Sequence, residues 1–292
     1  MNTNTVTCKI CSEKNHIDIN DNAAKVPSNI RQFKDEIFTV WRCKQCNSLA
    51  SLEDIDYNHY YENYVMHKQK LDFATRLLFS SRLRQLKRGG LLPHHSILDY
   101  GCGNGNFLKF IQGKKYLKAT GYDPFSSQFS DSSICQQKFD MVCSQDVIEH
   151  DPDPIDFLDK LSALTRRPGG KLAIGTPNAE YINLNKPSDR TWWLHQPHHR
   201  HIIGGKKLIE LLGKKGFRID LVERRSYIDT AIPFLNSAFY PSYITYIDGT
   251  VDSIFDPIKL DLVYKTPKLL FYGFFGYFLN QKKDIFIVAT AL

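Results

Sequence analysis

The segment Asp99-Tyr-Gly-Cys-Gly-Asn-Gly105 is the feature that most constrains the fold, because it directly follows a short apolar run. Glycines at alternate positions let a ligand approach the backbone closely and permit positive φ angles. A dinucleotide-binding fingerprint would require a further glycine at position 106, where this chain has Asn106. The pattern therefore argues against NAD. Taken alone, it is also compatible with a purely structural turn.

Apolar runs and helical periodicity alternate along the chain around this loop. This order predicts a mostly parallel sheet covered by helices on both faces. Ligands bind such sheets outside the carboxyl ends of the strands, where the glycine loop and Asp123 are expected to converge. The expected strands are 96–100, 118–122, 139–144, 171–175, 217–222 and 284–289, and the expected helices are 68–88, 107–112, 154–164 and 208–215.

Three further segments complete a family resemblance: Phe139–His150, Asp151–Pro154 and Arg167–Asn178. With the glycine loop and Asp123, the chain resembles class I S-adenosylmethionine (SAM)-dependent methyltransferases, in the group related to ubiquinone-biosynthesis and sugar methyltransferases. The resemblance spans roughly residues 65–225 and the last strand. It implies SAM as cofactor and an α/β, Rossmann-like, mostly parallel sheet with an antiparallel last strand.

The resemblance also implies a cofactor site. The loop would contact the methionine end of SAM, the end of the second strand would contact the ribose, and the next strand end would pass beside the sulfonium and adenosine. These three groups are Asp99, Gly101, Gly103, Asn104 and Gly105; then Asp123 and Pro124; then Ser144, Gln145 and Asp146.

The chain departs from the family between Asp123 and Asp140, where the segment is too short for the usual helix and strand. The usual contact to adenine has no clear counterpart there. Asp131 is a candidate substitute. We expect the adenine pocket to be open or to be formed by the lid, residues 226–283.

Methyl transfer from a sulfonium is an in-line displacement, in which the enzyme mainly aligns the reactants. A hydroxyl, amine or carbon acceptor must also lose a proton, and histidine is the side chain best suited to take it near pH 7. The candidates are His150, after the fourth motif, and His199 and His201, which match an H-x-H segment of the family. Each could instead pack or cap a helix. Tyr181 is a further candidate for the substrate wall.

Two C-x-x-C pairs, Cys8/Cys11 and Cys43/Cys46, predict a structural Zn²⁺ site in a small N-terminal zinc-ribbon domain. The long loop between the pairs costs little entropy, and the metal would supply folding energy that so short a segment lacks. The alternative is four free thiols in a poorly folded tail. Disulfides are not expected, because the polar start shows no secretory signal and favours a cytoplasmic location.

Composition sets the rest of the chain apart. Residues 226–283 are rich in aromatics and interrupted by prolines, and we expect a lid or substrate insertion. The apolar run 269–279 is flanked by lysines and is expected to be a core or lid segment, or to make peripheral contact with a membrane. The predicted segments are 1–55 (zinc ribbon), 56–95 (linker and helix), 96–225 (SAM-binding core), 226–283 (insertion) and 284–292 (last core strand).

The leading functional hypothesis is methylation of a small molecule, at oxygen or carbon of a sugar-like or other metabolite. A zinc ribbon joined to this enzyme type resembles deoxysugar C-methyltransferases and, more distantly, ribosomal-RNA guanine methyltransferases. The net charge of +7 favours an anionic substrate, but acids dilute the cations of the ribbon, so nucleic acid is disfavoured. A SAM-binding protein without catalysis is the third hypothesis. Oligomeric state is not predicted.

Overall fold

A computed structural model describes residues 5–62, 64–279 and 281–292. Residues 1–4, 63 and 280, which fall in the predicted zinc-ribbon, linker and insertion segments, lie outside the described residues. The chain forms two compact units, each assembled from three separate segments. Unit 1 comprises 1–68, 177–204 and 228–283, and unit 2 comprises 69–176, 205–227 and 284–292.

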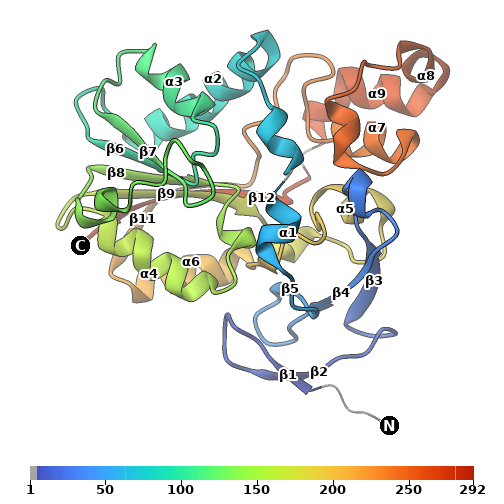
Figure 1. Ribbon diagram of the computed structural model, residues 1–292, viewed down its shortest axis with the longest axis horizontal. Helices are drawn as coiled ribbons and strands as arrows, with labels where there is room; N and C mark the ends of the chain where they lie inside the picture. Colours follow the sequence, from blue (N-terminus) through green and yellow to red (C-terminus); the bar gives the residue numbers. More distant parts are fainter. Residues whose placement is uncertain (1–4, 63, 280) are drawn as a thin grey trace. The chain divides into compact units, whose positions relative to one another are not determined.

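Unit 2 is built on a six-stranded sheet of order β11-β12-β9-β8-β6-β7 (Figure 1). Strand β6 pairs in parallel with β7 and β8, and β8 pairs in parallel with β9. Strand β11 pairs antiparallel with β12, so the predicted α/β fold with an antiparallel end is confirmed. The strands are β6 (Ile97–Tyr100), β7 (Ala119–Tyr122), β8 (Met141–Gln145), β9 (Lys171–Pro177), β11 (Phe217–Glu223) and β12 (Asp284–Ala291).

Helices cover both faces of this sheet, α2 and α3 on one and α4 and α6 on the other (Figure 1). Neighbouring residues Ile97 and Leu98 are therefore both fully buried, as expected for a two-sided parallel sheet. The helix predicted over 68–88 begins at Phe73, because the Asp72 side chain accepts a hydrogen bond from Thr75 N and caps it. The helical elements are α2 (Phe73–Arg88), α3 (Asn106–Gln112), η3 (Ser132–Gln136), η4 (Ile148–His150), α4 (Pro154–Leu164) and α6 (Gly205–Lys214).

The segment after β7 is as short as the sequence indicates. β7 is the edge strand, and among the described residues of the sheet no strand follows it on that side. Instead the chain turns, with Asp123 N donating to Phe129 O at 2.9 Å, and continues through η3. Asp131 caps η3 by accepting from Ser133 N, so the structure gives this side chain a local structural partner.

Unit 1 contains an antiparallel sheet of order β10-β5-β4-β3 and a separate β1-β2 hairpin. The H-x-H segment leads into the edge strand β10, which begins at His201; His201 pairs with Ala50 and Ile202 with Leu49. The sequence pattern had not indicated these strands. They are β1 (Thr5–Thr7), β2 (Lys14–His16), β3 (Ala23–Pro27), β4 (Ile37–Arg42), β5 (Leu49–Ser51) and β10 (His201–Ile202).

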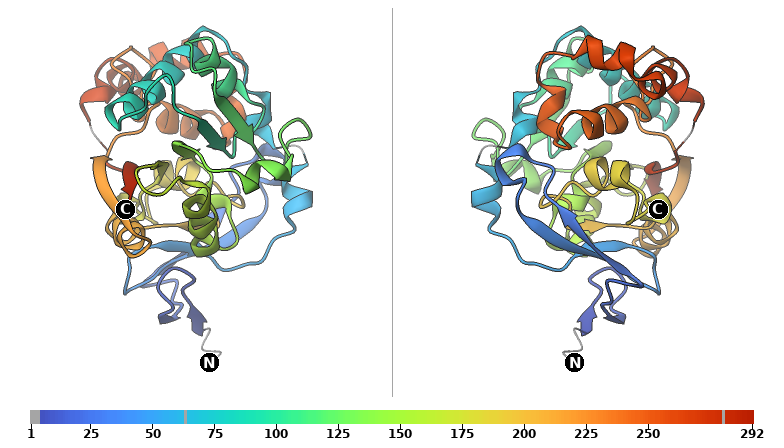
Figure 2. Two further views of the ribbon diagram at one scale, coloured as in Figure 1. Left: turned by 90° about the vertical axis from the view of Figure 1, so that its left-hand side faces the viewer. Right: turned by 90° about the vertical axis from the view of Figure 1, so that its right-hand side faces the viewer.

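Helices complete unit 1, and residues 228–283 contribute three that gather together, α7, α8 and α9 (Figure 2). They share an apolar cluster centred on Phe239, Tyr243, Val263 and Leu269. No helix of the described residues is long and apolar enough to span a membrane. The helical elements are η1 (Arg31–Phe33), α1 (Tyr57–Tyr61), η2 (Val65–Lys68), η5 (Ala179–Tyr181), α5 (Pro187–Trp192), α7 (Phe239–Ile247), η6 (Val251–Ile254), α8 (Leu260–Lys265), α9 (Pro267–Phe275) and η7 (Gly276–Phe278).

Candidate functional site

The glycine loop of unit 2 connects β6 to α3 and has three residues in the left-handed region, Gly101, Gly103 and Gly105. A Cβ at Gly101 would stand 2.3 Å from Val147 Cγ2, and one at Gly105 would stand 2.5 Å from the Phe129 ring. A Cβ at Gly103 would meet no atom within 4 Å. The loop is therefore packed at both ends and open at its middle, where a ligand could reach the backbone.

Asp99, at the end of β6, is buried and paired with Arg82 of α2. Arg82 Nη2 donates to Asp99 Oδ1 at 2.7 Å, and the guanidinium also lies 3.8 Å from the centroid of the Phe107 ring. Burial opposes the charge of Arg82, but the nearby Asp99 carboxylate holds the pKa of Arg82 above its ordinary value. Asp99 Oδ2 is buried and has no hydrogen-bond partner among the described residues. This oxygen fits a positively charged donor such as an amino group.

Asp123 and Asn104 hold the loop in position. Asp123 Oδ2 accepts from Gly103 N at 2.9 Å, while its Oδ1 accepts from Phe125 N at 2.9 Å. Asp123, the residue predicted to bind the ribose, therefore lies at the glycine loop, and the next residue, Pro124, is exposed. The Asn104 side chain donates to Gln69 O at 3.0 Å, which ties the loop to the segment before α2.

The carboxyl end of β8 carries the other predicted cofactor residues. Ser144 is buried, and its Oγ has no hydrogen-bond partner in the described chain. The Gln145 side chain donates to Asp146 Oδ1 at 2.8 Å, and Gly175 of β9 leaves the space that Gln145 occupies. Asp146 has a positive φ of 56°, an uncommon conformation that often occurs at functional sites.

Asp146 also forms a hydrogen bond with the phenol of Tyr227, a residue that the sequence analysis did not select. Desolvation raises the pKa of both groups. The charge of Asp146 and this hydrogen bond raise the pKa of Tyr227 further, whereas the same bond lowers the pKa of Asp146. Glu149, in η4, is fully buried; desolvation and then the Asp146 charge raise its pKa well above the ordinary value. Its Oε2 accepts from Thr176 Oγ1 at 2.9 Å. A carboxylate whose pKa is raised binds a proton more readily than an ordinary carboxylate does.

The predicted histidines fall in both units. His150, in unit 2, ends η4 and is half-buried. In unit 1, His199 Nδ1 donates to Trp193 O at 2.7 Å, which places the hydrogen of the neutral ring on Nδ1 and makes Nε2 the basic nitrogen. Burial lowers the pKa of His199 to about 4, so the ring is neutral at pH 7. His201 is buried in β10, and Tyr181 is exposed in η5.

The four predicted zinc ligands come together in unit 1 on two turns with the same backbone geometry. The first cysteine of each pair, Cys8 or Cys43, accepts at its carbonyl from the residue after the second cysteine, Ser12 or Asn47. Both of these residues have left-handed φ angles, 62° and 58°. The first cysteine's N–H then donates to the next residue along, Glu13 O or Ser48 O.

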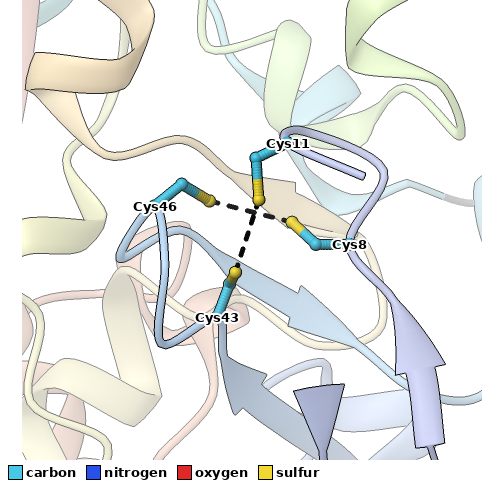
Figure 3. A group of neighbouring side chains, drawn as sticks. All are labelled: Cys8, Cys11, Cys43 and Cys46. Carbon is cyan, nitrogen blue, oxygen red and sulfur yellow. Dashed lines mark hydrogen bonds between the residues drawn. The ribbon is translucent and has the colours of Figure 1, made fainter. Parts of the chain in front are cut away.

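The four sulfur atoms face one another (Figure 3). Cys8 Sγ lies 3.7 Å from Cys46 Sγ, Cys11 Sγ lies 3.6 Å from Cys43 Sγ, and all four fall within 4.8 Å of one another. A tetrahedron with metal–sulfur distances of about 2.3 Å has edges of about 3.8 Å. Asn15 Nδ2 also donates to Cys43 Sγ at 3.4 Å. The cluster therefore fits a structural zinc ion.

Hydrogen bonding within the cluster matches this interpretation. The bond to Cys46 raises the pKa of the Cys8 thiol, and the bond from Cys8 lowers the pKa of Cys46 to about 4. Two sulfurs that share one proton are close enough to share a cation in its place.

Tyr227 and Arg82 are the residues of unit 2 that sequence reasoning missed. Tyr227 follows β11 in the segment Glu223-Arg-Arg-Ser-Tyr227, far along the chain from Asp146. Only the folding of β11 into the sheet brings it near. Arg82 was assigned to a helix, where a basic residue is ordinarily expected to face solvent.

The chain matches the model of the methyltransferase domain family over residues 57–222. It is 32% identical over 118 residues to a tRNA U34 carboxymethyltransferase from Pseudoalteromonas translucida, covering 30% of this chain and 35% of the relative. It is 26% identical over 177 residues to a ubiquinone biosynthesis O-methyltransferase from Coxiella burnetii, covering 45% of this chain and 72% of the relative. The chain thus spans about a third of the length of the first relative.

A similar fold is found in a chain of the complex between the Haloferax volcanii Trm112 methyltransferase activator and a methyltransferase. The TM-score is 0.50 at 14% sequence identity, over 82% of this chain and 99% of that one. The likeness concerns the fold alone. The family match covers more than half of the chain and includes the glycine loop, Asp123 and the end of β8. The chain therefore belongs to the methyltransferase domain family, and its identification as a class I SAM-dependent methyltransferase is confirmed by family and fold.

Proposed function

We propose that this protein methylates an oxygen or carbon atom of a small metabolite, with SAM as methyl donor. SAM supplies an electrophilic methyl group on its sulfonium. Asp99 Oδ2 would accept a hydrogen bond from the amino group of the cofactor, and the open backbone at Gly103 would let the cofactor approach closely. One carboxylate oxygen of Asp123 would give up its hydrogen bond from a backbone N–H and accept hydrogen bonds from the ribose hydroxyls instead.

The acceptor must lose one proton as the new bond to carbon forms. Asp146 and Tyr227 lie at the carboxyl end of β8 and are hydrogen-bonded to each other, so they can take and pass on that proton. The raised pKa of Asp146 improves it as a base over an ordinary carboxylate. His150, His199 and His201 stay candidates for the same role, and His199 would act through Nε2.

The observation that carries the small-molecule proposal is how unit 1 uses three cations of its N-terminal segment, Arg31, Arg42 and Lys44. Arg42 is directed inward, and its guanidinium donates to the carbonyls of Asn47, Ala179 and Ile182 at 2.6–2.8 Å. Arg31 bonds to two carboxylates of residues 248 and 256 at 2.6–2.9 Å. These cations are neutralised or satisfied within the unit and are not displayed for phosphates.

Lys44, the third cation of the group, forms an ion pair with Asp21. RNA-binding surfaces concentrate unpaired Lys and Arg with stacking aromatics. Similarity to a tRNA-modifying enzyme favours RNA as the second candidate substrate, and the fold shared with a chain of an activator complex favours a protein partner in that case.

Methyl-labelled SAM tests both candidates. The purified chain is incubated with total RNA or with an RNA-free metabolite extract, and the labelled product is separated before and after nuclease treatment. Label in the metabolite fraction that resists nuclease supports the proposal. Label that appears only in RNA overturns it. A chain that binds no SAM in isothermal titration at millimolar concentration would be no methyltransferase. Asp99→Asn is the inactive control.

A further inference from the structure

Helix α9 and the following turn η7 expose a row of phenylalanines. Phe271, Phe274 and Phe275 follow the spacing i, i+3, i+4 and share one face of α9, and Phe278 follows in η7. The opposite face is buried, with Leu269 fully enclosed in the apolar cluster of α7, α8 and α9. α9 therefore contributes its buried face to the apolar cluster of unit 1, and the phenylalanine row lies outside that cluster. The exposed row is Phe271 (49%), Phe274 (52%), Phe275 (53%) and Phe278 (74%).

The neighbouring helix α8, which packs against α9, adds two more exposed apolar side chains. Leu260 is 58% exposed and Tyr264 is 68% exposed, and they stand one helical turn apart. We call these six residues, Leu260, Tyr264, Phe271, Phe274, Phe275 and Phe278, the aromatic face. Exposed apolar groups of this density usually mark a binding surface.

Exposed lysines lie at the ends of α8 and at the start of α9. Lys265 and Lys268 lie where α8 meets α9, and both are exposed and form no ion pair within the described residues. Lys259 is exposed at the start of α8. Asp261 is the acid of this helix pair, so lysines outnumber carboxylates over residues 259–268. The face therefore attracts an anionic partner as well as an apolar one.

We propose that the aromatic face docks on an anionic membrane surface. Phenylalanine rings would enter the boundary between headgroups and acyl chains, and the lysines would remain beside lipid phosphates. α9 is nine residues long, which suits lying in the interface rather than crossing it. A second copy of the chain fits less well, because a twofold contact would bring the same lysines against each other. This inference does not depend on the proposed methyl transfer.

Vesicle co-sedimentation tests the proposal with the full chain. We expect the protein to sediment with vesicles of phosphatidylcholine and phosphatidylserine, and far less with phosphatidylcholine alone. Phe274→Ser with Phe275→Ser should weaken binding roughly tenfold or more. Lys265→Glu with Lys268→Glu should reduce the affinity for anionic vesicles roughly fivefold or more for each lysine removed, and should reduce the difference between anionic and neutral vesicles.

Leu117→Ser with Lys118→Glu is the matched control, because both residues are exposed and lie in unit 2. It should bind vesicles like the wild type. Equal binding by the Phe274/Phe275 variant and the wild type would overturn the proposal, and so would failure of the wild type to bind the anionic vesicles. A wild-type dimer in analytical ultracentrifugation that this variant dissociates, without vesicle binding, would assign the face to self-association. SAM titration is measured separately, so a failure of methyl transfer is not confused with a failure of docking.

Discussion

The buried Arg82–Asp99 pair gives the sharpest stability prediction. Replacing Arg82 with Met keeps much of the side-chain volume but leaves the Asp99 carboxylate without its charge partner. The side chains are only 9% and 3% exposed, so water cannot replace the lost contact without a rearrangement. The variant should therefore be much less stable than a surface Arg→Met variant.

The size of the effect follows from the contacts. Breaking a buried ion pair by removing one partner costs about 3–5 kcal/mol. Loss of the guanidinium from the Phe107 ring, 3.8 Å from its centroid, adds about 0.5–1 kcal/mol. For a cooperative unit of this size, these losses together correspond to a fall in Tm of about 7–24 °C. The double variant Arg82→Met with Asp99→Asn buries no charge, and should recover most of that fall.

Thermal unfolding followed by circular dichroism measures the cycle, with Arg88→Met as the control because the Arg88 side chain is 60% exposed. The reasoning fails if Arg82→Met lowers the Tm no more than the control does. It also fails if the double variant is no more stable than Arg82→Met alone. In either case Asp99 would not carry a buried charge.

Three further predictions concern the metal, the loop and a buried acid. Cys43→Ser should lose zinc, which elemental analysis should find at one ion per wild-type chain, and should lower the Tm because the metal supplies folding energy. Gly101→Ala has a φ of +80° and a Cβ 2.3 Å from Val147 Cγ2, so it should cost about 1–3 kcal/mol and weaken SAM binding in calorimetry. Gly213→Ala, whose Cβ meets nothing within 4 Å, should be neutral or stabilising. Burial raises the pKa of Glu149, so the native state holds a proton that the unfolded chain releases above pH 4.5. Stability should therefore fall as pH rises from there toward the raised pKa, and Glu149→Gln should flatten the fall in a series of Tm measurements.

Each of these predictions has a contrary outcome. Purified wild-type protein without zinc, yet fully folded, would contradict the structural metal site. Equal SAM affinity in Gly101→Ala and Gly213→Ala would show that the loop conformation does not matter for the cofactor. Parallel stability curves for wild type and Glu149→Gln across the pH range would mean that Glu149 titrates normally.

Unit 2 follows closely from local sequence pattern. Its strands are continuous apolar runs buried on both faces, and its helices have clear caps such as Asp153 before Pro154. The glycine loop and Asp123 were found because strand ends in a parallel sheet meet at one edge. Even the missing strand after β7 could be predicted, since the number of residues available there is a property of the sequence.

Unit 1 could not be predicted in the same way. β5 and β10 are three and two residues long and are paired across some 150 residues of chain, so neither has a period of its own to recognise. The cysteine spacing identified the metal site, but not the sheet that continues from it to His201. Tyr227 was missed for the same reason: its bond to Asp146 exists only after β11 has joined the sheet.

The position of β12 affects the order of events during synthesis. This strand lies between β11 and β9, inside the sheet, and is formed by residues 284–291. On a ribosome, β11 would be made first and would have no neighbour to pair with until residue 291 emerged. Residues 228–283 intervene between these two strands, so helices α7, α8 and α9 can form while the sheet is still open. The nascent chain would thus leave the backbone N–H and C=O groups along one edge of β9 unpaired until β12 has been made.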